Sequence, residues 1–133
     1  MKNEKSKPAA GPGRPRFSIR ARIKSFQYAF EGLKAFFGEQ HNALVHAAAT
    51  GIVILLCVVV KLHGTELLFI VLVTGLVWIA ELFNTAIEKL CDLVSPGFNP
   101  RVKFIKDVAA AAVLVSALVA VITAFIIFIP RLL

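Results

Sequence analysis

The stretch that decides the fold of this 133-residue chain is residues 67–92, which read LLFIVLVTGLVWIAELFNTAIEKLCD. Residues 67–80 are apolar apart from one threonine and one glycine. As a helix they would extend over about 21 Å, at 1.5 Å per residue. From residue 81 onward the stretch becomes polar while its spacing stays helical. We therefore predict a membrane-spanning helix over residues 67–94 whose last turns approach the membrane surface.

Two further apolar runs predict two more spans, at about residues 43–61 and 104–129. In the first, residues 43–60 are interrupted only by His46 and Thr50, and the second carries no charge beyond Asp107. We expect short polar turns at residues 61–66 and 95–100, and we expect Pro130 to end the last span. The predicted fold class is an all-α membrane protein with three transmembrane helices.

The composition agrees with a membrane protein. Hydrophobic residues make up 58% of the chain, charged residues only 17%, and the mean hydropathy is +0.79. Soluble domains carry about 25% charged residues. The composition excludes a soluble globule, a disordered chain and a disulfide-stapled miniprotein, and Cys57 and Cys91 are expected to be core residues.

The N-terminal part contains two different segments. Residues 1–16 have no apolar periodicity and predict a disordered basic tail, whereas residues 17–37 predict an amphipathic helix lying on the membrane surface. An alternative, compatible with the first, is that its apolar face packs on other helices. The apolar positions at spacings of three and four are Ile19, Ile23, Phe26, Phe30, Leu33 and Phe37.

The net charge of +7 is distributed very unevenly. Nine of the 15 Lys and Arg residues precede residue 35, and four more lie between residues 89 and 106. Because basic flanks are retained in the cytoplasm, we expect the N-terminus and the 95–106 connection to be cytoplasmic. Anionic lipid headgroups account for this charge, so we expect no nucleic-acid partner.

Polar residues of the second span follow one face of the predicted helix. Glu81, Asn84, Glu88 and Asp92 are spaced i, i+3, i+7 and i+11, which places them on a single stripe. Ionisable residues in a span indicate function, and carboxylate oxygens suit Mg²⁺. The alternative is an interfacial helix end whose acids simply meet water and lysines.

Residues near the other two spans are expected to complete this polar region. Lys106 and Asp107, at the start of the third span, should lie at the depth of the acidic end of the stripe. Glu39, Asn42 and His46 precede or begin the first span, where a lone histidine is more often a hydrogen-bonded spacer than a ligand. The chain has no glycine-rich phosphate loop and no spacing typical of a covalent nucleophile. Phosphate chemistry would therefore depend on carboxylates, metal and lysine.

Two motifs resemble the signature of the bacterial diacylglycerol kinase and undecaprenol kinase family. They read ELFNTAIE at residues 81–88, followed by Asp92, and KDVAAAAV at residues 106–113. The resemblance extends over about residues 20–130. It implies a homotrimer with active sites shared between subunits at the cytoplasmic surface of the bacterial inner or plasma membrane. It also implies phosphorylation of a lipid alcohol, diacylglycerol or undecaprenol, with ATP and Mg²⁺.

The resemblance also implies roles for individual residues. Glu81 would be the catalytic base and would contact the lipid hydroxyl, and Glu88 would bind Mg²⁺. The residues implied in ATP binding are Tyr28, Asn84, Lys106 and Asp107, and Glu88 is implied in ATP binding as well as in metal binding. The other residues implied in lipid binding are Arg22 and Phe30.

This chain departs from the family pattern at two positions. Gln40 occupies the place of an expected metal-binding glutamate, with Glu39 one residue earlier, so Glu39 is a candidate metal ligand only if the backbone shifts. A family arginine falls opposite Ala21, between Arg20 and Arg22.

A membrane scaffold or a small ion-coupled transporter is the alternative function. Transport predicts acids near the middle of the bilayer, whereas the stripe lies toward its cytoplasmic side. The sequence therefore favours the lipid kinase, and it leaves open which lipid alcohol is the substrate.

Overall fold

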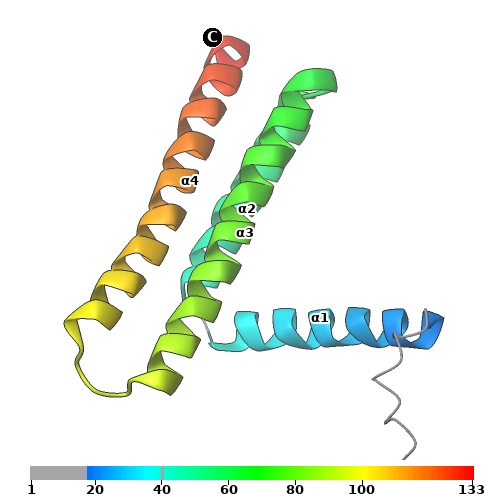
Figure 1. Ribbon diagram of the computed structural model, residues 1–133. Helices are drawn as coiled ribbons and strands as arrows, with labels where there is room; N and C mark the ends of the chain where they lie inside the picture. The colour runs from blue at the N-terminus through cyan, green and yellow to red at the C-terminus, as the bar shows by residue number, and fades with distance from the viewer. Residues whose placement is uncertain (1–17, 40) are drawn as a thin grey trace, which may run out of the picture. The chain divides into compact units, whose positions relative to one another are not determined.

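A computed structural model describes residues 18–39 and 41–133, apart from the side chains of Glu39 and His41, and these residues form helices only. The helices are α1 (Ile19–Glu39), α2 (His41–Val59), α3 (Gly64–Val94) and α4 (Pro100–Leu132) (Figure 1). The predicted tail at residues 1–16 and the departure at Gln40 lie outside the described residues.

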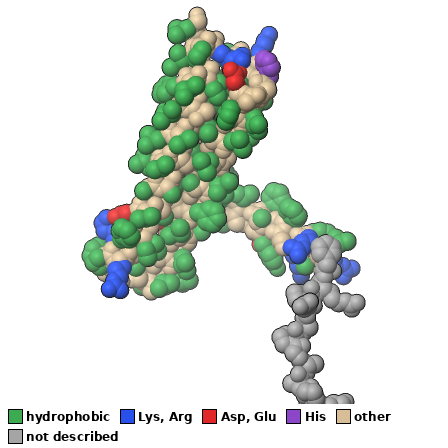
Figure 2. Space-filling model, turned by 45° about the horizontal axis from the view of Figure 1, so that its top comes forward, with side chains coloured by type: hydrophobic (Ala, Val, Ile, Leu, Met, Phe, Trp, Pro, Cys, Tyr) green, Lys and Arg blue, Asp and Glu red, His purple; other side chains and the backbone are tan. Residues whose placement is uncertain are grey.

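Three of these helices, α2, α3 and α4, are long and apolar enough to cross a membrane. Their candidate spans are Asn42–Val59, Gly64–Val94 and Pro100–Leu132. Large apolar side chains are exposed along all three helices, which is stable in lipid but not in water. Figure 2 shows this apolar surface, with charged side chains gathered at the two ends of the bundle. The predicted all-α membrane fold is confirmed.

The chain divides into two units, one ending at Gly32 and the other beginning at Leu33. In the first unit, the described residues of α1 are all exposed, and Ser25 Oγ donates a hydrogen bond to the Ala21 carbonyl at 3.0 Å. The second unit contains the end of α1 and the three long helices. In this unit the α2–α3 turn and the C-terminus lie at one end and the α3–α4 turn at the other (Figure 1).

The turn between α2 and α3 is closed by the backbone. The Leu62 N–H donates to the Cys57 carbonyl at 2.8 Å and the Lys61 N–H to the Val58 carbonyl at 3.1 Å. This pair of bonds is a Schellman motif, in which the residue after the helix adopts a left-handed conformation. Lys61 does so with φ of 51°, and Leu62 is buried beside α2 and α3. Because α3 already begins at Gly64, the turn is shorter than the predicted 61–66.

Both ends of α4 lie beyond the predicted boundaries. At its start, the Asn99 side chain accepts a hydrogen bond from the Arg101 N–H at 3.0 Å, and Pro100 takes the first helical position. The prediction that Pro130 ends this helix was wrong, because α4 continues to Leu132. A proline removes its own N–H from the helix and crowds the carbonyl four residues earlier, but it does not stop the residues after it from closing a turn. Here the Leu133 N–H donates to the Ile129 carbonyl at 3.2 Å.

Helices α3 and α4 pack against each other along a seam of small and apolar residues. The buried residues of α3 recur at spacings of seven, four, three and seven, so they form one stripe. They are Ile70, Val77, Glu81, Asn84 and Cys91. The polar stripe predicted from the sequence is therefore a continuation of the apolar seam. On α4 the small residues Ala109 and Ser116 are buried, which permits close approach of the two helices in lipid.

The packing of α4 predicts a difference between two neighbouring alanines. Ala109 is buried and Ala110 is exposed. Ala109→Leu should destabilise the bundle by about 1–3 kcal/mol, because the added methyl and methylene groups have no space in the seam. Ala110→Leu, the matched control, should change stability little. Unfolding measured in detergent micelles tests this, and equal stability of the two variants would contradict the packing.

Candidate functional site

Burial decreases along the polar stripe of α3, from the interior of the bundle to its end. The exposed fraction is 1% for Glu81 and 5% for Asn84, whereas Glu88 is half-buried and Asp92 is exposed. All four side chains lie on one helix face, and the packing of the neighbouring helices decides how deeply each is enclosed. The stripe therefore joins a carboxylate enclosed by protein to carboxylates that water reaches.

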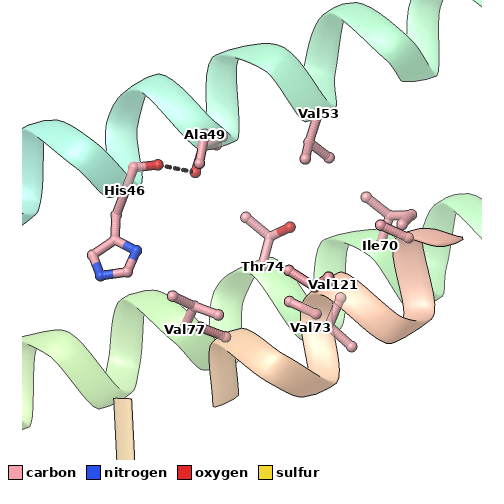
Figure 3. A pocket seen from close by; sticks show the side chains of 12 residues that line it. His46, Ala49, Val53, Ile70, Val73, Thr74, Val77 and Val121 are labelled. Atoms are coloured by element: carbon pink, nitrogen blue, oxygen red, sulfur yellow. Dashed lines mark hydrogen bonds between the residues drawn. The ribbon is translucent and has the colours of Figure 1, made fainter. Parts of the chain in front are cut away.

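Glu81 lies beside His46 of α2. The distance between His46 Nε2 and Glu81 Oε2 is 4.0 Å, and the His46 side chain is 20% exposed against 2% for Glu81. Figure 3 shows the His46 imidazole extending from α2 toward α3. Burying an ionised carboxylate is costly unless a polar or oppositely charged group accompanies it. His46 supplies such a group from a different helix.

One helical turn later, Asn84 and Glu88 interact. Asn84 Nδ2 donates a hydrogen bond to Glu88 Oε1 at 3.5 Å, and Asn84 Oδ1 is buried without a hydrogen-bond partner among the residues that the structure describes. Within the same described part of the chain, the hydroxyl of Thr85 is likewise buried without a hydrogen-bond partner. Buried polar atoms are nearly always hydrogen-bonded, so unsatisfied oxygens at this point indicate a place where a donor or a cation can be bound.

These oxygens fit a magnesium ion that arrives with a nucleotide. The described part of the chain holds no group of three or more His, Cys, Asp or Glu residues able to enclose a metal. Mg²⁺ usually binds one or two carboxylates together with substrate phosphates, rather than a cage made only of protein. Glu88 and the Asn84 carbonyl oxygen suit that arrangement. The side chain of Glu39, the other candidate ligand, lies outside the described residues, as does Gln40.

Basic residues of α4 face the exposed end of the stripe. Lys106 Nζ lies 2.5 Å from Asp92 Oδ1, and Lys103 Nζ lies 2.5 Å from Asp107 Oδ2. The Lys106–Asp92 pair places Lys106 at the depth expected from the sequence. These residues line a hollow of about 440 Å³ between the end of α3 and the start of α4, together with the turn at residues 95–99. The hollow therefore carries two ammonium groups, which are able to bind phosphate oxygens, and two carboxylates that pair with them.

Three sequence-predicted residues belong to the other unit of the chain. Arg22, Tyr28 and Phe30 lie on α1 before Gly32, and all three are exposed. The structure brings together Glu81 with His46, Asn84 with Glu88, and Asp92 with Lys106. The roles of Arg22, Tyr28 and Phe30 stay predictions.

A polar link between α2 and α3 was not predicted from the sequence. Trp78 Nε1 donates a hydrogen bond to Thr50 Oγ1 at 3.1 Å, and the Thr50 hydroxyl donates to the His46 carbonyl at 2.7 Å. The indole ring contacts His46, Phe36 and Phe37, with centroid distances of 6.2, 6.2 and 5.5 Å. Trp78 itself was the sequence feature that could have predicted this link, since a buried tryptophan N–H usually finds a hydrogen-bond acceptor.

A cavity of about 150 Å³ lies between α2, α3 and α4 and was likewise not predicted from the sequence (Figure 3). His46 lies at its lining beside Val77, and the other walls are largely apolar. On α4 the cavity is lined by Ala117, Ala120 and Ala124, at helical spacings of three and four. A hydrocarbon chain is chemically suited to this space, and it would lie next to the His46–Glu81 pair.

Comparison with known proteins identifies the family. The family model for prokaryotic diacylglycerol kinase matches residues 27–128. An undecaprenol kinase of Bacillus subtilis is 38% identical over 110 residues, which cover 83% of this chain and 89% of that protein. A diacylglycerol kinase of Synechocystis is 36% identical over 112 residues, covering 84% of this chain and 64% of that protein.

A diacylglycerol kinase of Escherichia coli strain K12 is 33% identical over 108 residues, covering 76% of this chain and 83% of that protein. The matched region contains α2, α3, most of α4 and the second half of α1, and so includes the whole polar stripe. This confirms the resemblance noted in the two sequence motifs, and the chain belongs to the prokaryotic diacylglycerol kinase family.

Proposed function

We propose that this chain transfers the terminal phosphate of ATP to the hydroxyl group of a membrane lipid. Its family membership supports a lipid kinase, and one structural observation supports the site. A fully buried carboxylate, Glu81, lies on the same helix face as the half-buried Glu88, seven residues or about 10 Å away along α3. A lipid hydroxyl held in the bilayer and a phosphate arriving from water can therefore meet along one stripe.

Glu81 is the proposed general base. Its carboxylate accepts the proton from the lipid hydroxyl while the hydroxyl oxygen forms a bond to the terminal phosphorus of ATP. The bond from that phosphorus to the bridging oxygen breaks at the same time, and ADP leaves. General-base catalysis of this kind contributes roughly 10²–10⁴-fold to a rate. The burial of Glu81 supports this role, because it keeps bulk water away from the carboxylate that accepts the proton.

The exposed end of the stripe is the proposed nucleotide site. Glu88 and the buried Asn84 oxygen would hold Mg²⁺ together with the phosphates of ATP, and the bound ion supplies neutralisation of phosphate charge. Lys106 neutralises further charge through its ammonium group, and Asp107 accepts hydrogen bonds from the sugar. In-line phosphoryl transfer depends mainly on such positioning and electrostatic stabilisation. The Lys106–Asp92 pair supports this assignment, since it keeps the ammonium at the hollow.

The chain is proposed to act at the cytoplasmic surface of the bacterial plasma membrane. The concentration of basic residues before residue 35 and around the α3–α4 turn supports this orientation. The family resemblance further supports a homotrimer in which neighbouring subunits share the active sites, with Arg22 and Phe30 of α1 contacting the lipid and Tyr28 the nucleotide.

Both lipid alcohols named for the relatives fit the proposed chemistry, because each presents a primary hydroxyl at the membrane surface. The experiment that tests the function offers diacylglycerol and undecaprenol in competition to the purified protein in mixed micelles with radiolabelled ATP. We expect phosphate to be transferred to at least one of the two lipids in a magnesium-dependent reaction. Hydrolysis of ATP without any labelled lipid would contradict the proposal.

Replacing the proposed base should stop the chemical step. Glu81→Gln preserves the shape of the side chain but removes its ability to accept a proton. We expect the turnover number to fall at least about 100-fold, with ATP binding unchanged. Glu66→Gln is a matched control, because Glu66 lies on the same helix at its opposite end and pairs with Arg131. Near-normal turnover in Glu81→Gln would exclude the base assignment.

Replacing Glu88 should have a different signature. Glu88→Gln removes a charged oxygen ligand, so we expect the magnesium concentration for half-maximal rate to rise about tenfold or more. The measurement is a magnesium titration at saturating lipid and ATP. If the titration curve of the variant coincides with that of the unchanged protein, Glu88 is not a metal ligand.

A further inference from the structure

The Glu81 carboxylate is buried, and a catalytic carboxylate in that position needs a fixed orientation. A carboxylate can turn about its last bonds, so burial alone does not aim an oxygen at a substrate hydroxyl. Positioning matters for rate, since a displacement of about 1 Å in a catalytic group lowers a rate roughly 100-fold. The basic side chain that the structure places beside Glu81 is His46, with its Nε2 4.0 Å from Glu81 Oε2.

His46 is itself held by contacts on two sides. Its carbonyl accepts the Thr50 hydroxyl, whose oxygen accepts the Trp78 indole N–H. This chain of two hydrogen bonds fixes the His46 turn of α2 against α3, three residues before Glu81. The Trp78 ring also meets the imidazole nearly edge-on, at an interplanar angle of 64°, which limits the rotation of the imidazole.

Phe36 and Phe37 enclose the same tryptophan from the end of α1. Phe36 is buried, and both rings lie within 6.2 Å of the indole centroid. Trp78 is therefore fixed by aromatic contacts on one side and by Thr50 on the other. A histidine that only filled space would not need a neighbouring tryptophan fixed on both sides.

We propose that His46 is a positioning residue for the base: its imidazole, 4.0 Å from the Glu81 carboxylate and therefore beyond hydrogen-bond distance, favours electrostatically the carboxylate orientation that accepts the lipid proton. The Trp78–Thr50 pair fixes the turn of α2 that carries His46. This inference rests on the proposed function and goes beyond it, because it names a residue that acts on the reaction only through Glu81. A spacer histidine would affect folding but would have no specific effect on the chemical step.

The first test separates the chemical step from binding. His46→Ala should lower kcat roughly 10- to 100-fold while the KM values for lipid and ATP stay within about twofold. His46→Gln, which places an amide N–H near the position of Nε2, should recover part of the lost kcat. His63→Ala is the matched control, since His63 is exposed in the α2–α3 turn and should leave kcat unchanged. Unchanged kcat in His46→Ala, or a change in KM alone, would overturn the proposal.

A double-mutant cycle gives the second test. If His46 acts through Glu81, His46→Gln should cost less in Glu81→Asp, whose shorter carboxylate is already displaced, than in the unchanged protein. Additive losses in kcat would overturn the proposal. Trp78→Phe retains the aromatic ring but loses the N–H, and it should lower kcat several-fold with KM unchanged. If His46→Ala fails to fold, the kcat of Trp78→Phe still tests the proposal.

These outcomes are distinguishable from failure of the proposed function. If the unchanged protein phosphorylates no lipid, the lipid kinase proposal itself is wrong. If the unchanged protein is active and the His46 variants keep full kcat, the lipid kinase proposal stands and the role of His46 is excluded.

Discussion

The burial of one carboxylate, Glu81, is the constraint on which the arrangement of the three long helices depends. An ionisable group inside an apolar bundle is unfavourable unless other groups accompany it. In this protein His46 of α2 is the polar group beside Glu81. Glu81 is enclosed because it belongs to the buried face of α3, which packs against α4. A bundle of purely apolar helices could slide or rotate in lipid with little penalty, whereas a buried acid beside a histidine favours one register between α2 and α3.

The same constraint explains why the candidate site is a stripe and not a pocket enclosed by loops. A helix that leaves the membrane carries one face through a gradient of polarity, from lipid to water. Glu81, Glu88 and Asp92 occupy successive positions along that face, and Asp92 pairs with a lysine. In the proposed function Glu81 meets a lipid hydroxyl and Glu88 a cation with phosphates. A reaction between a lipid and a water-soluble nucleotide requires these two environments to be adjacent.

Much of the fold followed from pattern alone, because apolar length and charge asymmetry act independently of tertiary contacts. The three spans were recognisable from residues 43–61, 67–94 and 104–129, and the two motifs at residues 81–92 and 106–113 led to the family. The end of α4 was predicted incorrectly, since Pro130 is tolerated in the last turn of a helix. The helix propensity of proline is low, but how much a proline destabilises a helix depends on its position in that helix.

The sequence by itself determined that the protein is a three-span helical membrane protein and that its acids share one helix face, because both follow from periodicity along a single segment. Only the tertiary structure decided which of those acids is enclosed and what lies beside each. The His46–Glu81 pair, the Trp78–Thr50 link and the Lys106–Asp92 pair each join different helices. Their existence depends on how α2, α3 and α4 rotate and approach one another, and no spacing within a single helix encodes that geometry.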